Sequence, residues 1–172
     1  MITVTFDYCP RCGEKLVPKQ IGDEGDVPFC GKCERPFFPY SSPCVICLCV
    51  SENDDVLLIK QSYGIIRFVC VAGYIKAGEN AEDAAKREIA EETGLEMTGA
   101  RFLYSKYYDK HDNLMLAFLC RVKKAEPRIS SELTEAHWFS PKDAENALFQ
   151  GAYGIDMLHE WQRLRDRGLL EI

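Results

Sequence analysis

The chain alternates short apolar runs with polar turns, and only a few stretches have a helical pattern. Apolar runs of strand length occupy six segments: 44–50, 56–60, 67–72, 101–108, 113–122 and 136–139. Helical spacing predicts helices at 80–93 and 155–167, and Ser140 followed by Pro141 predicts the start of another. Strands interleaved with a few helices predict an α/β (α+β) domain.

The composition is that of a globular protein with a real core. The chain has 172 residues, of which 47% are hydrophobic, and a net charge of −6. This length suits one domain plus a small appendage. The nine cysteines are an odd number, and the first ten residues lack a signal-peptide pattern, so we expect reduced cysteines, a cytoplasmic location and no membrane partner. Five cysteines lie in apolar runs and are interpreted as core residues: Cys44, Cys47, Cys49, Cys70 and Cys120.

Two CxxC pairs stand near the start of the chain, with seventeen residues between them: Cys9, Cys12, Cys30 and Cys33. Short runs at 15–16 and 27–29 predict the strands of a hairpin between the pairs. This spacing predicts a four-cysteine zinc ribbon, whose Zn²⁺ would be structural because thiolates fill all four positions. Two redox-active pairs are the alternative. The sequence therefore divides into a zinc ribbon at 1–36, a linker at 37–43 and a main domain at 44–172.

The predicted helix at 80–93 carries three carboxylates spaced i, i+3 and i+4 on one face: Glu88, Glu91 and Glu92. Carboxylates this close repel one another unless a cation intervenes, and clustered oxygen ligands suit Mg²⁺. Arg87 on the same helix would pair with Glu79 and hold the preceding loop in place. A solvated acidic helix face is the alternative interpretation.

Residues 73–95 read GYIKAGENAEDAAKREIAEETGL and match G-x5-E-x7-R-E-U-x-E-E-x-G-U at every specified position, where U is aliphatic. By this motif, the Nudix box, the chain resembles the Nudix hydrolases. The resemblance implies the Nudix fold, an α/β/α sandwich with a mixed sheet between helices. A zinc ribbon before such a domain resembles the NADH pyrophosphatase-like branch, as do the segments FFPYSSP, VAGYIKAGE and ELTEAHWF.

The resemblance also implies a site. Catalytic roles fall to the box residues and to one glutamate outside it: Glu79, Arg87, Glu88, Glu91, Glu92 and Glu132. Catalytic Mg²⁺ or Mn²⁺ would be held by Glu88, Glu91, Glu92 and the carbonyl of Ala72. Substrate contacts fall to Phe38, Gly73, Tyr74 and Tyr108. The glutamate that acts as base is left open. Glu135 competes with Glu132, and a surface carboxylate without a role is a further alternative.

The chain departs from that branch after the box. The branch carries a signature close to S-Q-P-W-P-F-P-x-S, whereas residues 105–113 read SKYYDKHDN. Only the serine survives, and Tyr108 stands at the tryptophan position. A rigid proline-rich wall has become a polar loop, so the particular substrate stays open.

These features predict a Mg²⁺-dependent pyrophosphohydrolase. It would cleave a nucleoside diphosphate linked to X, such as NADH, NAD, ADP-ribose or FAD, into mononucleotides. One alternative is decapping of NAD-capped RNA, guided by basic ribbon residues: Arg11, Lys15, Lys19, Lys32 and Arg35. Acidic neighbours weaken that alternative: Asp23, Glu24 and Asp26. A non-catalytic nucleotide sensor is the other. By resemblance alone, a homodimer is also compatible with the sequence.

Overall fold

The computed structural model describes residues 6–64, 66–149 and 151–170. The chain divides into two compact units. The N-terminal unit comprises Met1–Ser42 with Tyr108–Asn113, and the main unit comprises Pro43–Tyr107 with Leu114–Ile172. Each unit has its own hydrophobic core. The division into 1–36, 37–43 and 44–172 stays a prediction of the sequence.

A three-stranded sheet of order β1-β2-β3 forms the centre of the N-terminal unit. Its elements are β1 (Val17–Gln20), the 3₁₀ turn η1 (Gly22–Glu24), β2 (Asp26–Cys30) and β3 (Arg35–Pro36). β1 and β2 pair antiparallel, with Val17 opposite Phe29 and Gln20 opposite Asp26. The expected hairpin is confirmed, but its first strand was wrongly placed at 15–16. The pairing begins at Val17, while Lys15 forms an isolated bridge with Tyr8.

Seven strands form the sheet of the main unit, with order β10-β5-β4-β9-β8 and two short strands beside it. The strands are β4 (Ser42–Val50), β5 (Val56–Gln61), β6 (Phe68–Val69), β7 (Val71–Tyr74), β8 (Met97–Tyr108), β9 (Asn113–Val122) and β10 (Leu133–Phe139). The helices are α1 (Ala81–Thr93), α2 (Pro141–Ala147) and α3 (Tyr153–Asp166). No helix in the described part of the chain is both long and apolar enough to cross a membrane.

The sheet of the main unit is mixed. β5 pairs antiparallel with both β4 and β10, and β7 pairs antiparallel with β4. β4 and β9 run in the same direction. The starts of the two strands contact each other, and so do their ends. The Ser42 N–H donates to the Asp112 carbonyl before β9 (2.8 Å), and Arg121 near the end of β9 donates to the Ser51 carbonyl after β4 (2.8 Å).

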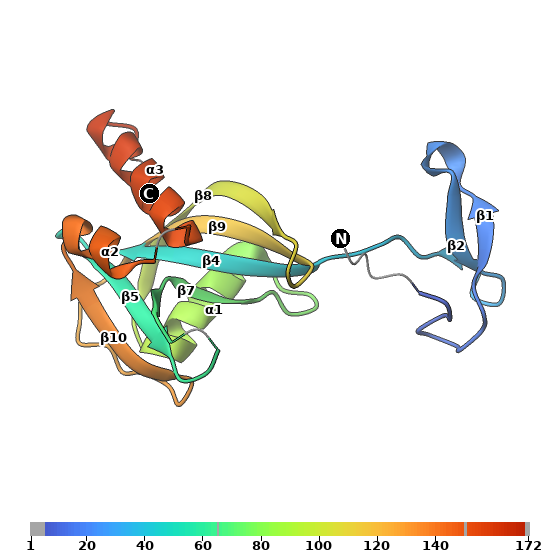
Figure 1. Ribbon diagram of the computed structural model, residues 1–172, viewed down its shortest axis with the longest axis horizontal. Helices are drawn as coiled ribbons and strands as arrows, with labels where there is room; N and C mark the ends of the chain where they lie inside the picture. The colour runs from blue at the N-terminus through green and yellow to red at the C-terminus, as the bar shows by residue number, and fades with distance from the viewer. Residues whose placement is uncertain (1–5, 65, 150, 171–172) are drawn as a thin grey trace. The chain divides into compact units, whose positions relative to one another are not determined.

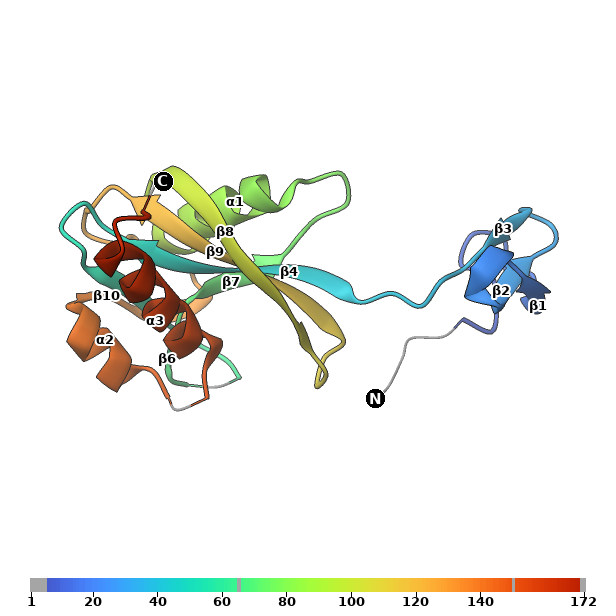
Figure 2. The same cartoon turned by 90° about the horizontal axis from the view of Figure 1, so that it is seen from above.

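Helices cover both faces of this sheet, as Figures 1 and 2 show. The alternation of side chains along β4 explains the arrangement. Val45, Cys47 and Cys49 pack in the core that contains Ala85 and Ile89 of α1. Ile46, Leu48 and Val50 pack in a second core with α2 and α3, which contains Leu158 and Trp161. These two cores confirm the expected α/β/α sandwich.

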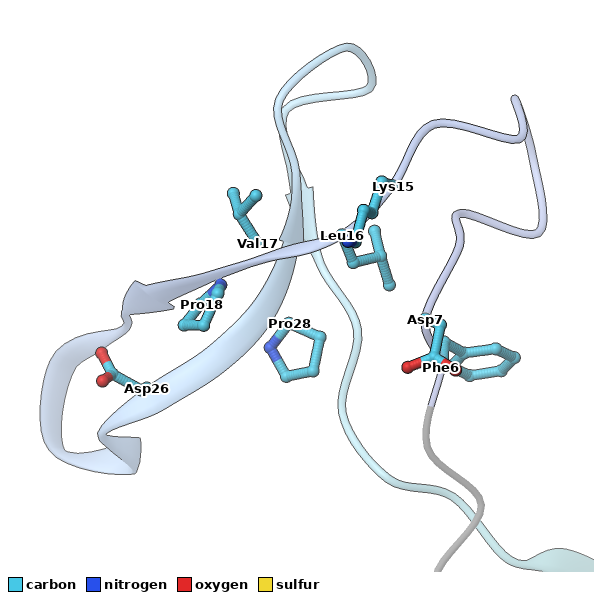
Figure 3. Close-up of a pocket in the computed structure, with 8 residues that line it drawn as sticks. All are labelled: Phe6, Asp7, Lys15, Leu16, Val17, Pro18, Asp26 and Pro28. Atoms are coloured by element: carbon cyan, nitrogen blue, oxygen red, sulfur yellow. The ribbon is translucent and has the colours of Figure 1, made fainter.

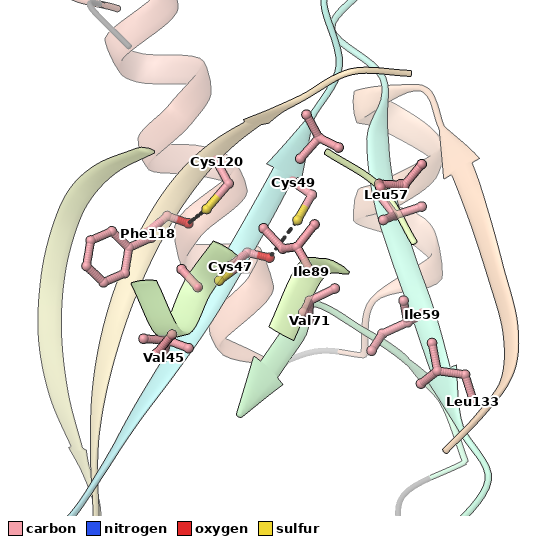
Figure 4. Packing of buried hydrophobic residues seen from close by; sticks show 14 residues of the cluster. Val45, Cys47, Cys49, Leu57, Ile59, Val71, Ile89, Phe118, Cys120 and Leu133 are labelled. Atoms are coloured by element: carbon pink, nitrogen blue, oxygen red, sulfur yellow. Dashed lines mark hydrogen bonds between the residues drawn. The ribbon is translucent and has the colours of Figure 1, made fainter. Parts of the chain in front are cut away.

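The five cysteines expected in the core are buried there. Figure 4 shows three of them, which lie on β4 and β9 and pack among hydrophobic side chains of several elements. The Cys49 thiol donates to the Cys47 carbonyl at 3.8 Å, and the Cys120 thiol donates to the Phe118 carbonyl at 4.0 Å. Burial raises the pKa of the Cys49 thiol well above its ordinary value. These thiols act as small apolar residues.

The single strand predicted at 67–72 was wrong. The segment divides into β6 and β7, which pair with different neighbours. Phe68 and Val69 lie opposite Lys60 and Ile59 of β5, whereas β7 lies opposite the first half of β4. β5 itself meets β4 at the other end of that strand, where Val50 lies opposite Val56. A local apolar run does not reveal such a change of partner.

Candidate functional site

Helix α1 is the element that places the three acidic side chains. It begins after Asn80 and ends at Gly94, which adopts a left-handed conformation (φ 68°) and donates its N–H to the Ala90 carbonyl. This confirms the helix predicted from 80–93, because glycine is the residue that terminates a helix this way at least cost. Ala84, Ala85 and Ile89 are buried against the sheet. The box glutamates therefore project from the side of the helix that is next to its buried face.

Arg87 holds the loop before the helix against the helix itself. Its Nε donates to Glu79 Oε1 at 2.7 Å, and its Nη2 donates to Glu79 Oε2 at 2.9 Å and to the Tyr74 carbonyl at 3.0 Å. Its Nη1 donates to Glu88 Oε1 at 2.6 Å and to Glu91 Oε2 at 3.1 Å. The expected ion pair between Arg87 and Glu79 is confirmed.

The bidentate contact has an electrostatic consequence. Hydrogen bonding from Arg87, together with the Lys76 backbone N–H, lowers the pKa of Glu79 to about 2. The same contact with Glu79 raises the pKa of the Arg87 guanidinium above its usual range. A lowered pKa favours the ionised form of Glu79, which holds Arg87, and Arg87 in turn donates hydrogen bonds to Glu88 and Glu91.

Gly73 lies directly beneath the Glu88 carboxylate. A Cβ atom added at Gly73 would stand 2.0 Å from Glu88 Cδ and 2.1 Å from Glu88 Oε1. The backbone of β7 can approach the carboxylate this closely only because residue 73 has no side chain. The close approach of Glu88 thus explains why residue 73 is a glycine. This structural role is separate from the substrate contact expected from the sequence.

Glu92 is the buried member of the acidic group, with 5% of its surface exposed. Its Oε2 has no hydrogen-bond partner among the described residues. Burial raises the pKa of Glu92 to about 8, with further contributions from the Glu88, Glu132 and Glu91 carboxylates. A buried carboxylate oxygen left without a donor among other carboxylates is the setting that a divalent cation would relieve. These residues therefore fit Mg²⁺ or Mn²⁺.

Exposure differs among the three box glutamates, although the sequence placed them on one face. Glu91 is exposed, Glu88 is partly buried and Glu92 is buried. Within the described ranges, one group of at least three potential metal ligands has all its donor atoms within 4.8 Å of one another. That group is the four N-terminal cysteines. The carboxylates are spread more widely, and Arg87 draws two of them, Glu88 and Glu91, toward itself.

Glu132 stands beside this group, whereas Glu135 is engaged elsewhere. The Glu132 charge is among those that raise the pKa of Glu92. Glu135 Oε1 accepts from Lys60 Nζ at 2.7 Å, and its other oxygen lies 3.3 Å from His137. Of the two candidates outside the box, the geometry favours Glu132 as the partner of the acidic group.

The aromatic candidates are divided between the two units. Tyr74 lies in β7 of the main unit with 60% of its surface exposed, and Ala72 on the same strand lies opposite Ile46. Phe38 (45% exposed) and Tyr108 belong to the N-terminal unit. Their grouping around one substrate stays a prediction, as does a role for the Ala72 carbonyl.

Two residues beside the acidic group were not singled out from the sequence. The Tyr63 hydroxyl lies 3.5 Å from Glu132 Oε2, and Lys76 Nζ lies 3.7 Å from Glu91 Oε1. Burial raises the pKa of Tyr63, and the Glu132 and Glu92 charges add to this. Lys76 lies inside the box, so its position in the sequence could have indicated that it lies near the acidic group. Tyr63 belongs to the loop after β5, where no local pattern links it to residue 132.

The four cysteines of the N-terminal unit converge on one point. Cys9 Sγ and Cys33 Sγ are 3.9 Å apart, and Cys12 Sγ and Cys30 Sγ are 3.5 Å apart. A tetrahedral Zn²⁺ with ~2.3 Å bonds to sulfur places its ligands about 3.8 Å apart. Although burial opposes it, hydrogen bonding by the Arg11 and Cys12 backbone lowers the pKa of Cys9 to about 7. The cluster fits one zinc ion better than two separate redox pairs.

A hollow of about 340 Å³ lies on the N-terminal hairpin, as Figure 3 shows. Its lining includes Phe6, Leu16, Pro18 and Pro28. None of its lining residues is a cysteine or a box glutamate, so we assign it no part in the chemistry of either cluster.

The chain belongs to the Nudix family, since the NUDIX domain matches residues 41–161. It is 31% identical over 143 residues to the NAD-capped RNA hydrolase NudC of Vibrio vulnificus, covering 81% of this chain and 52% of that protein. It is 33% identical over 156 residues to Nudix hydrolase 19, chloroplastic, of Arabidopsis thaliana, covering 85% of this chain and 35% of that protein. The chain thus spans about half or less of the length of these curated relatives.

Solved structures agree on the fold. A NUDIX hydrolase from Nitrosomonas europaea superposes with a TM-score of 0.69 at 20% identity, covering 95% of this chain and 94% of that chain. The NUDIX domain of Shewanella oneidensis NrtR, solved with ADP ribose, has a TM-score of 0.65 at 14% identity, covering 78% of this chain and 92% of that chain. At these identities the likeness concerns the fold alone.

Proposed function

We propose that the protein is a Mg²⁺- or Mn²⁺-dependent pyrophosphohydrolase. Its substrate is a nucleoside diphosphate linked to X, of the NADH, NAD, ADP-ribose or FAD type, which it cleaves into mononucleotides. One observation carries this proposal above the others. The box retains all its carboxylates, and one of them, Glu92, is buried with an unpartnered oxygen beside three more. A sensor without catalysis would have no need of this costly arrangement.

Each residue of the cluster has a role in this proposal. Glu88, Glu91 and Glu92 hold the divalent cation, with Glu132 completing the acidic group. When bound, the cation supplies charge neutralisation for the pyrophosphate and a lowered pKa for the attacking water. One of the carboxylates accepts the proton of that water. Arg87 and Glu79 orient the glutamates, and the exposed ring of Tyr74 offers a stacking surface for a base.

The substitution Glu91→Gln tests this site most cleanly, because Glu91 is exposed and its loss leaves the core untouched. We expect the variant to lose turnover by about 10²-fold or more, as losing a catalytic carboxylate typically does. Its melting temperature should stay that of the wild type. The measurement is hydrolysis of NADH, NAD, ADP-ribose, FAD, diadenosine polyphosphates and deoxynucleoside triphosphates with Mg²⁺, with products resolved by chromatography.

Glu82→Gln is the matched control, since Glu82 is an exposed glutamate in the first turn of the same helix. It should retain wild-type activity. Release of nicotinamide mononucleotide and AMP from NADH would identify nicotinamide dinucleotides as substrates despite the polar loop at 105–113. Equal turnover by Glu91→Gln and wild type would reject the site, and a wild type inactive on the whole panel would reject the small-molecule reaction.

A second candidate is hydrolysis of NAD-capped RNA, in which the same bond is cut. It is favoured by relatives named for that activity. It is also favoured by basic side chains that lie over aromatic rings in the N-terminal unit. Lys19 Nζ lies 3.8 Å from the centre of the Phe29 ring, and the Arg35 guanidinium lies 5.4 Å from that of Phe37. Basic groups beside aromatic rings suit single-stranded RNA.

Binding of a 5′-NAD-capped oligonucleotide separates this candidate from the first. RNA binding should weaken steeply as salt rises, because phosphate contacts release counterions, whereas free NAD should show little salt dependence. Lys19→Gln should weaken capped RNA and leave turnover of free NAD unchanged. If capped and free NAD bind alike at every salt concentration, RNA plays no part. A homodimer and a cytoplasmic location remain predictions of the sequence.

A further inference from the structure

The segment that carries Glu132 is attached to two elements far from it in the chain. On one side, the Ser130 N–H donates to the Glu92 carbonyl at 3.0 Å. On the other side, the Ser62 N–H donates to the Glu132 carbonyl at 2.8 Å, and the Ser62 hydroxyl donates to the same oxygen at 3.0 Å. The backbone of residue 132 is therefore held between the end of α1 and the end of β5.

These bonds fix the Glu132 backbone but leave its side chain free to rotate. Glu132 lies in a turn and is exposed, yet it is close enough to the buried Glu92 for its charge to help raise the pKa of that carboxyl. A ligand or base at this position needs a donor that holds the carboxylate toward the cluster. Tyr63, the residue after Ser62, has its hydroxyl 3.5 Å from Glu132 Oε2.

We propose that Tyr63 is the positioning residue for Glu132, donating its phenol O–H to Glu132 Oε2 so that the carboxylate faces the acidic cluster. This inference rests on the proposed function. A neutral donor suits the task because it directs the carboxylate without cancelling its charge. A contact of 3.5 Å is long for a hydrogen bond, and bonds of this kind tighten when the site is loaded.

Removing only the hydroxyl tests the proposal. Tyr63 is 56% exposed, so Tyr63→Phe should leave the melting temperature unchanged. Partners that orient a metal ligand typically contribute about 10–100-fold in metal affinity or activity. We expect Tyr63→Phe to weaken Mn²⁺ binding, measured by calorimetry without substrate, by about tenfold. In turnover, we expect kcat to fall while KM for the dinucleotide stays constant.

Two further variants sharpen the result. Tyr153→Phe is the matched control, because it removes a phenol hydroxyl from α3, on the other face of the sheet, and should change neither measurement. Tyr63→Ala removes the ring as well. If the hydroxyl is responsible, Tyr63→Ala should resemble Tyr63→Phe in Mn²⁺ affinity.

The outcomes separate this inference from the proposed function. Wild-type Mn²⁺ affinity and kcat in Tyr63→Phe, with an active wild type, would overturn the role of Tyr63 and leave the enzyme proposal standing. Weakened Mn²⁺ binding in Tyr63→Phe with no hydrolysis by the wild type would support the positioning role and reject the reaction. A wild type that neither binds Mn²⁺ nor hydrolyses any substrate would overturn both.

Discussion

Glu92→Gln should slow hydrolysis severely and at the same time stabilise the metal-free protein. Cations contribute several kcal/mol of charge stabilisation in reactions of this type. At about 1.4 kcal/mol for each factor of ten, losing a ligand carboxylate should lower kcat by roughly 10³-fold. The effect on stability has the opposite sign because Glu92 is buried, faces three other carboxylates and has an oxygen without a donor.

The stability effect should depend on pH in a defined window. Burial and neighbouring charges raise the pKa of Glu92 from 4.5 to about 8. An acid whose pKa is raised by folding favours the folded state while it is protonated, so its contribution is present below pH 4.5 and is lost as pH rises toward 8. Without Mg²⁺, the wild type should lose a few kcal/mol of stability across this window, at roughly 1.4 kcal/mol for each pH unit between the unfolded and folded pKa values.

Urea unfolding in Mg²⁺-free buffer between about pH 4.5 and 8.5 measures this contribution directly. Glu92→Gln should flatten the pH dependence, and added Mg²⁺ should stabilise the wild type but not the variant. Glu91→Gln is the control for stability, since Glu91 is exposed and is the smallest contributor to the raised pKa of Glu92, so the variant should retain most of the slope of the wild type. A variant that keeps wild-type turnover, or a wild type whose stability does not fall as the pH rises through this window, would contradict the assignment of Glu92.

Local spacing was sufficient to predict the box helix and the ion pair between Arg87 and Glu79. Asn80, Gly94 and the alanines between them specify α1 through contacts within one helix. Arg87 in α1 reaches Glu79 just before the start of that helix, so the pairing is encoded over eight residues. The burial of Glu92 was not predictable in the same way. Its spacing from Glu88 and Glu91 placed all three on one face, but its burial depends on how the helix sits on the sheet.

The parts of the site that local patterns did not reveal depend on contacts between distant segments. Glu132 joins the acidic group because Ser130 bonds to the end of α1 and Ser62 bonds to residue 132. Tyr63 reaches Glu132 across 69 positions of sequence. The loop after β5 and the turn before β10 meet because those strands pair with each other. No local pattern carries that pairing, so a single sequence could name Glu132 only by resemblance.

Removing zinc should unfold the N-terminal unit while the main unit stays folded. The core of the N-terminal unit consists of Cys9, Leu16 and Cys30 with a few partly buried neighbours. So small a core cannot offset the entropy of ordering its chain. Structural zinc contributes about 10–16 kcal/mol in comparable small modules. A zinc chelator, or Cys30→Ser in the full chain, should therefore remove amide protection from residues 6–42 and leave that of the main unit.

Hydrogen exchange and zinc analysis on the intact protein decide the matter. The wild type should carry one zinc per chain, Cys30→Ser should carry none, and returning Zn²⁺ to the chelated wild type should restore protection. Cys70→Ala is the control, since it removes a buried thiol from the core beside α3 and should retain zinc. If the zinc-free N-terminal unit keeps its protection, the four sulfurs do not fold around a metal. Disulfides in place of zinc would then support the redox alternative, in which Cys9–Cys12 and Cys30–Cys33 act as separate pairs.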